Sequence, residues 1–549
     1  MKPSLDANAQ GAREIVRFLA DQGIGHIFGL PGSSLASLVQ ELSESSVRII
    51  ATIHESVTVA AADGYARVAG KAAAYVYMVP GTTNALANIY NAWRDETPLL
   101  ILASQQAAWT RTREGTIGEA DLVPLVAPFC RHARELAPGM AVYRELERAM
   151  RSASGFPGGP SFLSLPEDVL EGDGPVLPEA RTHRVTSGAP DVGEIAKLLS
   201  VAQRPLIVAG GQVRRYGGST ILAELADRLG IAVTTEYGFS DRLALSPDHP
   251  AFLGSMTGLA GSVAEAQADF VLAVGCRFVS EGHPRPEPYF RNAKFVAHVN
   301  ADPAKLEETH TANWSCACDP AAFLAALAEA ARLPDEDLLA ERRNFIAAAR
   351  GASMPPGNPF AQTLASYGAA LASLHDALER GWVVDESVMG SVALIGSLKS
   401  GDGARYIGST GGSLGWGTGV AVGAAIASGG PVTCVLGDGA LRFGVHGLWT
   451  AVAEKLPITF VILDNGGYGS TRHFSRAYAD RVRNRKNAPS YAGMDFREMG
   501  APITDMIRGF GVACAGPVSI ADARAAIEAA WLSNGDGPNA VVIQLPFGD

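Results

Sequence analysis

Two polar side chains in the last third of the chain have the types and the spacing of a metal site. Asp438 stands in the run Gly437-Asp438-Gly439-Ala440, and Asn465 follows it by 27 positions. Each comes at the end of an apolar, β-branched run, and the gap fits a strand, a crossover helix and the next parallel strand. Both side chains would then lie at the carboxyl edge of one sheet, where open parallel sheets bind ligands.

The oxygens available there suit Mg²⁺ bound to a diphosphate. Asp438, Asn465 and a backbone carbonyl near Gly467 supply half of an octahedron, and Mg²⁺ usually takes its other ligands from phosphates and water. The glycines let the backbone close on a diphosphate, and the helix expected after Gly439 directs its amide groups towards it. A surface turn is the alternative for Gly-Asp-Gly alone, but a turn does not explain the spacing to Asn465.

A carboxyl group near the N-terminus is the strongest candidate for acid–base chemistry. Glu55 follows an apolar strand and opens a helix of small residues, which begins Val-Thr-Val-Ala-Ala-Ala. Apolar walls favour the protonated form of a carboxyl group, so such a residue can act as an acid. The structural alternative is that Glu55 only occupies the first turn of a helix, where acidic side chains interact favourably with the dipole.

The composition is that of a globular protein with several domains. The chain has 549 residues, of which 47% are hydrophobic and 18% are charged, and this length predicts three or four domains. The net charge of −11 argues against a nucleic-acid partner or an anionic membrane. The six cysteines form no zinc-binding pattern, the start lacks a signal-peptide core and no apolar run reaches membrane-spanning length, so we expect a cytoplasmic protein.

Alternating strands and helices predict the α/β class, with three successive domains that each contain a parallel sheet covered on both faces. The domains are expected at residues 1–175, 191–333 and 359–549, separated by linkers rich in Pro and Gly. The expected strands are 27–30, 47–53, 73–78, 98–103, 161–165, 205–209, 231–235, 270–274, 295–300, 382–384, 405–408, 432–436, 458–463 and 540–544.

Taken together, these motifs resemble the signature of thiamine-diphosphate-dependent enzymes. That signature is Gly-Asp-Gly, a helix-sized gap, and then Asn-Asn or Asp-Asn, which is Asp464-Asn465 here. The pair His54-Glu55 and residues 62–67 (Ala-Asp-Gly-Tyr-Ala-Arg) match the family's pyrimidine-binding domain. The resemblance covers nearly the whole chain and is closest to the benzoylformate decarboxylase and acetolactate synthase branch. It implies pyrimidine-binding, central and diphosphate-binding domains, in that order.

The resemblance implies thiamine diphosphate and Mg²⁺ as cofactors. Asp438, Asn465 and the carbonyl of Gly467 would bind the metal. Glu55 would hold the proton that the aminopyrimidine ring of the cofactor needs, and Leu414 would wedge between the two cofactor rings so that they face each other. The other residues expected at the cofactor are Asn84, Gly412, Ser413, Gly437, Gly439, Ala440, Tyr468 and Gly469.

The substrate pocket departs from that of benzoylformate decarboxylases at one position. Their pocket histidine, four residues before Gly81, is Tyr77 here, whereas Ser33 keeps the pocket serine. A phenol is a weaker acid than an imidazolium, so Tyr77 should donate a proton more slowly to the carbon left after loss of carbon dioxide. We therefore expect a second carbonyl compound to intercept that carbon and give a 2-hydroxy ketone. Thr471 and Phe474 would face the same pocket.

We therefore expect a lyase or carboligase that acts on a 2-oxo acid, with an aldehyde as the acceptor in carboligation. The resemblance also implies a homodimer or homotetramer with its active site at the subunit interface, and we expect no tightly bound flavin. The alternative is a dinucleotide-dependent oxidoreductase, because Gly417 and Gly419 could open a dinucleotide fingerprint with Asp438 as the ribose-binding acid. The third position of that fingerprint, which requires a small residue, falls on Val422. The oxidoreductase interpretation also leaves Asn465 without a role.

Overall fold

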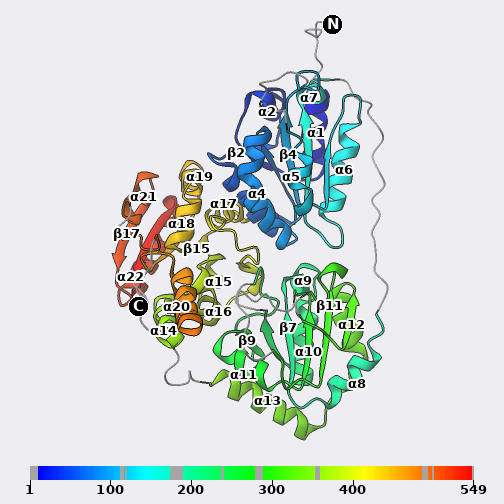
Figure 1. The fold of residues 1–549 in the computed structure, drawn as a ribbon, viewed down its shortest axis with the longest axis vertical. Coiled ribbons are helices and arrows are strands. Elements are labelled where there is room, and N and C mark those ends of the chain that lie inside the picture. Colours follow the sequence, from blue (N-terminus) through cyan, green and yellow to red (C-terminus); the bar gives the residue numbers. More distant parts are fainter. Residues whose placement is uncertain are drawn as a thin grey trace.

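The computed structural model shows three lobes, each containing one six-stranded parallel sheet. In Figure 1 the N-terminal lobe lies at the top, the central lobe below it and the C-terminal lobe to the left. The structure describes residues 10–111, 117, 120–172, 190–236, 240–277, 289–308, 310–352, 359–484, 493–497 and 500–546, with the backbone alone at 359–364, 477, 480 and 481. The expected α/β class and its three parallel sheets are confirmed.

The N-terminal sheet has the strand order β2-β1-β3-β4-β6-β5. Its inner strands β3, β4 and β6 are buried along their whole length, as their continuous apolar runs predict. The strands are β1 (His26–Gly29), β2 (Arg48–Ala51), β3 (Ala72–Val76), β4 (Leu99–Gln105), β5 (His132–Glu135) and β6 (Pro160–Pro166). The helices are α1 (Gln10–Asp21), α2 (Ala36–Ser43), α3 (Glu55–Ala69), α4 (Met78–Arg94), α5 (Val123–Val126), α6 (Val142–Ala153) and α7 (Glu167–Leu170).

The central sheet has the order β12-β11-β10-β7-β8-β9. The strands are β7 (Pro205–Ala209), β8 (Ala232–Thr235), β9 (Phe252–Ser255), β10 (Phe270–Val274), β11 (Phe295–Asn300) and β12 (Trp314–Ala317). The helices are α8 (Gly193–Val201), α9 (Gly211–Arg215), α10 (Ser219–Leu229), α11 (Leu259–Gln267), α12 (Pro320–Ala330) and α13 (Glu336–Arg350). The buried guanidinium of Arg342 in α13 donates to the carbonyls of Leu199 and Leu229, and so satisfies acceptors at the ends of α8 and α10.

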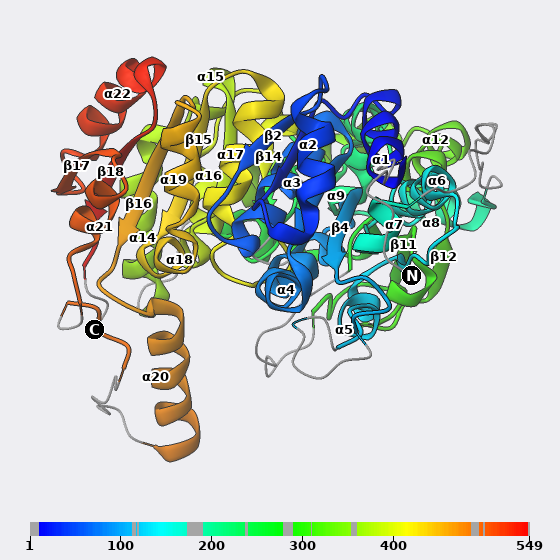
Figure 2. The same ribbon diagram turned by 90° about the horizontal axis from the view of Figure 1, so that it is seen from above.

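The C-terminal sheet has the order β14-β13-β15-β16-β18-β17. The strands are β13 (Trp382–Glu386), β14 (Tyr406–Ile407), β15 (Val432–Gly437), β16 (Ile458–Asp464), β17 (Ala513–Val518) and β18 (Asn539–Gln544). The helices are α14 (Pro359–Leu371), α15 (Ala377–Arg380), α16 (Ser391–Ser397), α17 (Gly417–Ser428), α18 (Asp438–Gly444), α19 (Gly447–Ala453), α20 (Gly469–Arg483), α21 (Ile503–Gly509) and α22 (Ala523–Ser533). Helix α20 extends away from the rest of the molecule (Figure 2).

Four strands were not predicted, and each lies at an edge of its sheet. They are β5, β9, β12 and β17. Strands β5, β12 and β17 are half-buried or exposed, so they lack the continuous apolar run that marks an inner strand. Strand β9 is buried but has four residues, one of which is a glycine. A search that relies on apolar runs therefore missed four of the six edge strands, while β2 and β14 were predicted.

The N-terminal and C-terminal lobes meet where α3 crosses α17. A Cβ added at Gly64 would lie 2.2 Å from the carbonyl oxygen of Val420, and one at Gly423 would lie 1.8 Å from that of Ala61. The two helices therefore touch backbone to backbone, which only glycine allows at these positions. This contact explains why α3 and α17 consist largely of small residues.

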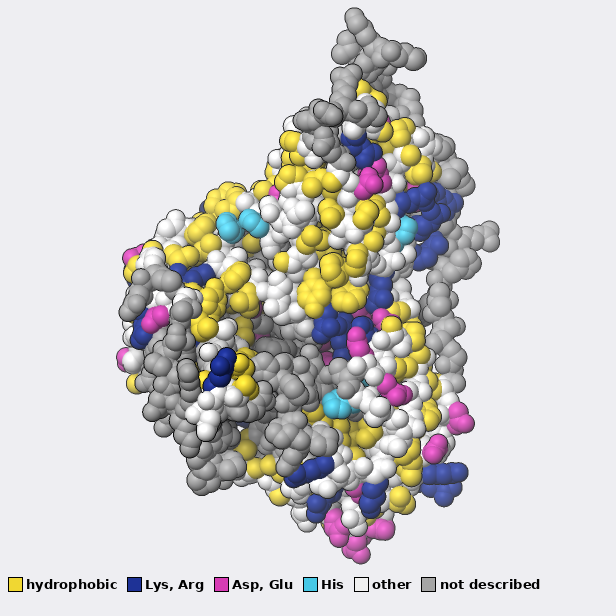
Figure 3. Space-filling model, viewed as in Figure 1, with side chains coloured by type: hydrophobic (Ala, Val, Ile, Leu, Met, Phe, Trp, Pro, Cys, Tyr) yellow, Lys and Arg dark blue, Asp and Glu magenta, His cyan; other side chains and the backbone are white. Residues whose placement is uncertain are grey.

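The N-terminal and central lobes meet at the C-terminal end of α4. Trp93 stands beside the rings of Tyr90 and Phe129, and the cationic groups of Arg277 and Lys305 lie 5.7 and 5.4 Å from its ring centroid. Figure 3 shows apolar side chains gathered over this end of α4, with basic side chains directly beneath them. Cation–π contacts thus join two lobes whose sheets are separate. Among the described helices, none is both long and apolar enough to cross a lipid bilayer.

Candidate active site

Glu55 is the first residue of α3 and lies against the first turns of α4. Its Oε2 accepts a hydrogen bond from Nδ2 of Asn84 at 3.1 Å. A Cβ added at Gly81 would lie 2.9 Å from Oε1 of Glu55 and 3.3 Å from Cβ of Tyr77. The side chain is half-buried. The structure therefore brings together three of the predicted residues, Glu55, Asn84 and Tyr77.

Tyr77 immediately precedes α4 and contacts the turn after β1. Its hydroxyl lies 3.5 Å from Oγ of Ser33, so the two candidate pocket residues are neighbours. The phenol ring covers Gly32, where an added Cβ would lie 2.2 Å from a ring carbon. A side chain at position 32 would displace the ring, so the glycine makes this contact between Tyr77 and Ser33 possible.

Asp438, which is buried, and Asp464, which is half-buried, form a pair of carboxyl groups at the carboxyl edge of the C-terminal sheet. Strands β15 and β16 run parallel, with Gly437 opposite Leu463, so both strands deliver an aspartate to the same edge. Asp438 is 2% exposed, and its Oδ2 has no hydrogen-bond partner among the described residues. Burial, followed by the negative charge of Asp464, raises the pKa of Asp438 to about 7. A buried oxygen without a partner beside a second carboxylate fits a bound cation.

The side-chain amide of Asn465 is held at both of its ends. Its Nδ2 donates to the hydroxyl of Tyr367 at 2.9 Å, and its Oδ1 accepts from Nη2 of Arg472 at 3.2 Å and from the amide of Gly467 at 3.2 Å. The Gly467 carbonyl, the expected third ligand, accepts from the amide of Gly469 at 2.8 Å. A carbonyl oxygen has two lone pairs, so one remains for a metal.

Tyr367 and Arg472 were not assigned a role from the sequence. Arg472 lies seven residues after Asn465 and directly after Thr471, which was expected in the substrate pocket, and this position was the available signal. Tyr367 lies 98 residues before Asn465 in α14, and no motif marks it. Burial, and to a smaller degree the charge of Asp438, raise the pKa of Tyr367.

The donor set at this edge suits Mg²⁺ better than a softer metal. Within the described part of the chain, no three His, Cys, Asp or Glu side chains converge on one point. A metal held by Asp438 must therefore draw on amide and backbone oxygens and on the ligand itself, which is the hard-oxygen environment that Mg²⁺ prefers. Asp438 and Gly467 supply oxygens of these kinds, and Asn465 would join them by giving up one of the two hydrogen bonds that its Oδ1 accepts, so the residues present fit the ion.

The loop before α17 holds three more of the predicted residues. Gly412 has a φ of +81°, which favours glycine, and Ser413 and Leu414 follow it half-buried. The next three amides, of Gly415, Trp416 and Gly417, donate to the carboxylate of Glu386 at 2.7 to 3.1 Å. Burial raises the pKa of Glu386 to about 7, against the effect of these three donors. The end of β13 thus anchors the loop just after Leu414.

The remaining predicted residues divide between the sheet edge and α20. Gly437, Gly439 and Ala440 flank Asp438, and a Cβ added at Gly439 would lie 3.8 Å from the ring of Tyr468. Thr471 and Phe474 are exposed on α20, which extends from the lobe in Figure 2. Their role in a substrate pocket stays a prediction.

The structure does not join the two groups of candidate residues directly. Within the described residues, no hydrogen bond or ion pair connects Glu55 with Asp438 or Asn465. The lobes that carry them are linked next to Glu55, where the ring of His54 stacks on that of His446 at 4.8 Å between centroids. Each group is therefore formed within its own lobe.

The dinucleotide interpretation finds no support in the structure. Gly417 and Gly419 lie inside α17, and the amide of Gly417 donates to Glu386. A Cβ added at Gly419 would lie 2.6 Å from Cβ of Ala60 in α3. These glycines serve the close packing of two helices, whereas a fingerprint needs its glycines in an open turn between a strand and a helix.

Comparisons with known proteins agree with this geometry along the whole chain. Three family models match, described as Thiamine pyrophosphate enzyme, with the N-terminal TPP binding domain at residues 9–125, the central domain at 192–327 and the C-terminal TPP binding domain at 391–543. Benzoylformate decarboxylase of Pseudomonas aeruginosa is 28% identical over 507 residues, which cover 90% of this chain and 91% of that protein. The acetolactate synthase large subunit of Buchnera aphidicola is 26% identical over 529 residues, which cover 93% and 90%.

A solved structure shows the same arrangement of domains. A putative thiamin diphosphate-dependent enzyme from Mycobacterium smegmatis superposes with a TM-score of 0.78 at 25% identity, covering 97% of this chain and 99% of that one. The three family models match in the order of the three sheets, and the predicted motifs lie within the two TPP-binding matches. The chain therefore belongs to the family of thiamine pyrophosphate enzymes.

Proposed function

We propose that the chain is a cytoplasmic enzyme that uses thiamine diphosphate and Mg²⁺ to decarboxylate a 2-oxo acid and to transfer the remaining carbon unit to an aldehyde. The buried, unpaired Oδ2 of Asp438 beside Asp464 and Asn465 carries the metal part of this proposal. The relatives named benzoylformate decarboxylase and acetolactate synthase support the class of substrate. None of the six cysteines, all of which lie among the described residues, forms a disulfide, and this supports a reducing compartment.

One set of residues would bind the cofactor and its metal, and Glu55 would transfer a proton. Asp438, Asn465 and the Gly467 carbonyl would hold Mg²⁺ and, through it, the diphosphate. When bound, thiamine diphosphate supplies the electron sink that lets a 2-oxo acid lose carbon dioxide. Glu55 would exchange a proton with the aminopyrimidine ring, and the Asn84 amide orients its carboxyl group.

The neighbouring Ser33 and Tyr77 place two hydroxyl groups within reach of a bound 2-oxo acid. These hydroxyls are 3.5 Å apart, and Gly81 lies between the Cβ end of Tyr77 and Glu55. Hydroxyl donors suit the substrate carboxylate, because they add no charge to a site that must release carbon dioxide. The slow proton donation expected of Tyr77 supports carboligation over release of a free aldehyde.

We also propose a homodimer or homotetramer with its active site at the subunit interface. Large apolar side chains are exposed on both sides of the His54–His446 stack, namely Ile53 at 39%, Phe443 at 57% and Trp449 at 38%. Exposed apolar side chains gathered at one place are typical of a contact surface. Because this surface adjoins Glu55, a second copy of the chain seated on it would enclose the acid–base group.

The metal site is tested by Asp438→Ala. We expect Mg²⁺-dependent affinity for thiamine diphosphate to fall by at least about 100-fold, because even changes around metal ligands cost about 10- to 100-fold. Calorimetric titration of the cofactor with and without Mg²⁺ measures the loss. Asp505→Ala, a change in the first turn of α21 in the same lobe, is the matched control. Unchanged affinity in Asp438→Ala would remove this residue from the metal site.

The role of Glu55 is tested by Glu55→Gln, which keeps the size of the side chain but cannot transfer the proton. We expect the variant to bind thiamine diphosphate while deuterium exchange at the thiazolium carbon slows by about 10²- to 10⁴-fold. Quenched-flow exchange followed by NMR measures the rate. Glu194→Gln makes the same change in the first turn of α8 and should exchange at the wild-type rate. A wild-type rate in Glu55→Gln would contradict its assignment.

Substitution of Tyr77 tests whether this residue controls the ratio of free aldehyde to 2-hydroxy ketone. Mass spectrometry of products from a panel of 2-oxo acids, with and without an aldehyde, identifies the substrates. With an acceptor present, we expect most of the product to be a 2-hydroxy ketone, and Tyr77→His should shift the product towards free aldehyde, because an imidazolium donates protons readily near neutral pH. Tyr90→His, on the far part of α4, should leave the ratio unchanged. An unchanged ratio in Tyr77→His would show that this position does not control protonation.

The assembly is tested at Trp449. Light scattering should give at least a dimer for the wild type, and Trp449→Glu should shift it towards the monomer, because a charge at the centre of an apolar contact must be desolvated. Leu532→Glu, which alters an 88% exposed side chain of α22, is the control and should keep the assembly. A wild-type monomer with full activity would refute the proposed assembly.

A further inference from the structure

One face of α4 is polar over its whole length. Asn84, Asn88, Asn91 and Asp95 follow one another at intervals of four, three and four residues, which places them on the same side of the helix and its end. Asn84 donates to Glu55, and Asn88 donates to the carbonyl and hydroxyl oxygens of Ser56. The first half of this face therefore supports the start of α3. The second half, Asn91 and Asp95, contacts the loop before α17 in the C-terminal lobe.

Asn91 binds the backbone of the loop that precedes α17. Its Nδ2 donates to the carbonyl of Ser413 at 2.9 Å, and its Oδ1 accepts from the amide of Ser413 at 3.1 Å. The side chain is fully buried, and its Nδ2 also donates to Oδ1 of Asn88 at 2.9 Å. At Gly411 an added Cβ would lie 2.1 Å from Oδ1 of Asn91, so the loop lies as close as glycine permits.

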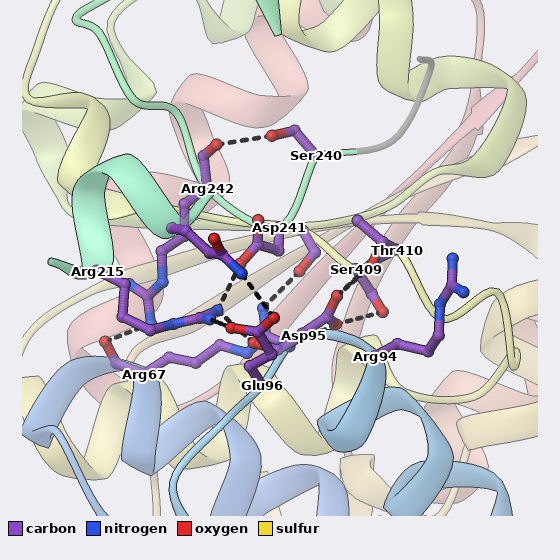
Figure 4. Close-up of polar contacts among 12 residues, drawn as sticks. Arg67, Arg94, Asp95, Glu96, Arg215, Ser240, Asp241, Arg242, Ser409 and Thr410 are labelled. Carbon is purple, nitrogen blue, oxygen red and sulfur yellow. Dashed lines mark hydrogen bonds and ion pairs between the residues drawn. The ribbon is translucent and has the colours of Figure 1, made fainter. Parts of the chain in front are cut away.

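Asp95 binds the start of the same loop. Its carboxylate accepts from the hydroxyl of Ser409 at 2.7 Å and from the amide and hydroxyl of Thr410 at 2.9 and 2.7 Å. Arg67 donates to Asp95 at 2.7 Å and also to the carbonyl of Gly408 at 2.7 Å. Figure 4 shows Ser409 and Thr410 turned towards Asp95, with Arg67 among the other charged residues of the cluster.

The charged cluster around Asp95 draws on all three lobes. Arg215 of the central lobe donates to Glu96 at 2.6 Å and to Asp241 at 3.1 Å, and Figure 4 places these side chains beside Asp95. Burial alone would raise the pKa of Asp95, but Arg67 and the hydrogen bonds from the loop lower it below its ordinary value. Asp95 is therefore a charged acceptor, and hydrogen bonds to it are stronger than those between neutral groups.

The loop is thus anchored on both sides of the residues expected at the cofactor. Asp95 and Asn91 hold it from Ser409 to Ser413, and Glu386 holds the three amides after Leu414. Preorganised contacts of this kind remove the cost of ordering a loop when a ligand binds. The N-terminal lobe therefore sets the shape of a loop that belongs to the C-terminal lobe.

We propose that Asn91 and Asp95 are positioning residues, which hold residues 409–414 in the shape that receives the aminopyrimidine ring. The inference rests on the proposed use of thiamine diphosphate. Neither residue needs to touch the cofactor, because each acts through the backbone or hydroxyl groups of the loop. The polar face of α4 then orients both Glu55, through Asn84, and the loop, through Asn91 and Asp95.

The test measures the loop and the cofactor separately. In Asn91→Ala without cofactor, we expect hydrogen–deuterium exchange of the peptide that covers residues 409–415 to accelerate about tenfold, because the amide of Ser413 loses its acceptor. We expect the affinity for thiamine diphosphate to fall about tenfold, measured by calorimetry at saturating Mg²⁺. Asn539→Ala is the matched control, since Asn539 is also buried and donates to a backbone carbonyl, that of Ala530.

A second variant probes Asp95 without breaking the buried charges. The double substitution Ser409→Ala and Thr410→Val removes both hydroxyl donors and leaves the Arg67–Asp95 ion pair intact, so the fold is preserved. We expect the same two changes as in Asn91→Ala. Ser246→Ala is its control, because the Ser246 hydroxyl also donates to a carbonyl of a neighbouring segment, that of Gly401 at 2.8 Å.

The outcomes separate this inference from the function on which it rests. If the wild-type chain binds no thiamine diphosphate, the proposed function fails and the inference fails with it. If the wild type binds the cofactor but loop exchange in both variants matches the wild type, the inference alone is overturned. It is also overturned if the loop exchanges faster while the affinity for the cofactor stays the same, because the contacts would then serve the fold only.

Discussion

The buried guanidinium of Arg67 is the interaction on which the junction of the lobes depends. It donates to Asp63 at 2.8 Å, to Asp95 at 2.7 Å and to the carbonyl of Gly408 at 2.7 Å, and it lies 5.0 Å from the ring centroid of Trp416. Its charged side chain is 1% exposed. Loss of one partner from a buried ion pair costs about 3–5 kcal/mol, so these elements cannot separate independently. The loop of residues 409–414 begins directly after Gly408, so Arg67 fixes the point at which this loop leaves β14.

Three buried carboxyl groups show how their surroundings decide their roles. Glu386 accepts three backbone amides, and Asp95 accepts a guanidinium and two side-chain hydroxyls, so both are satisfied within the chain. Asp438 has an oxygen without a hydrogen-bond partner in the described part of the chain and lies beside the negative charge of Asp464. A buried polar atom that the fold leaves unpaired is costly, so it marks the place where a ligand is expected. The first two groups anchor the loop of residues 409–417, and the third is suited to hold a metal.

Much of the fold could be predicted, because the inner strands are continuous apolar runs that must be buried on both faces. The four unpredicted strands, β5, β9, β12 and β17, lie at sheet edges, where one side needs no strand partner and the apolar signal is weaker. The crossing of α3 and α17 was not predicted either. Gly64 and Gly423 are small residues in helices, and their spacing alone does not say which other helix each will touch.

The sequence by itself determined that Asp438 and Asn465 lie together at one edge of a parallel sheet. The sequence analysis expected one crossover helix in the interval from Asp438 to Asn465, and the structure has two short ones, α18 and α19, between β15 and β16; in both cases the two parallel strands end at the same sheet edge. Only the tertiary structure decided the contacts of Ser33 with Tyr77, of Tyr367 with Asn465 and of Asn91 with Ser413, which join residues 44, 98 and 322 positions apart. These contacts depend on how whole helices and lobes pack, and short polar side chains leave no periodic pattern that would reveal their partners.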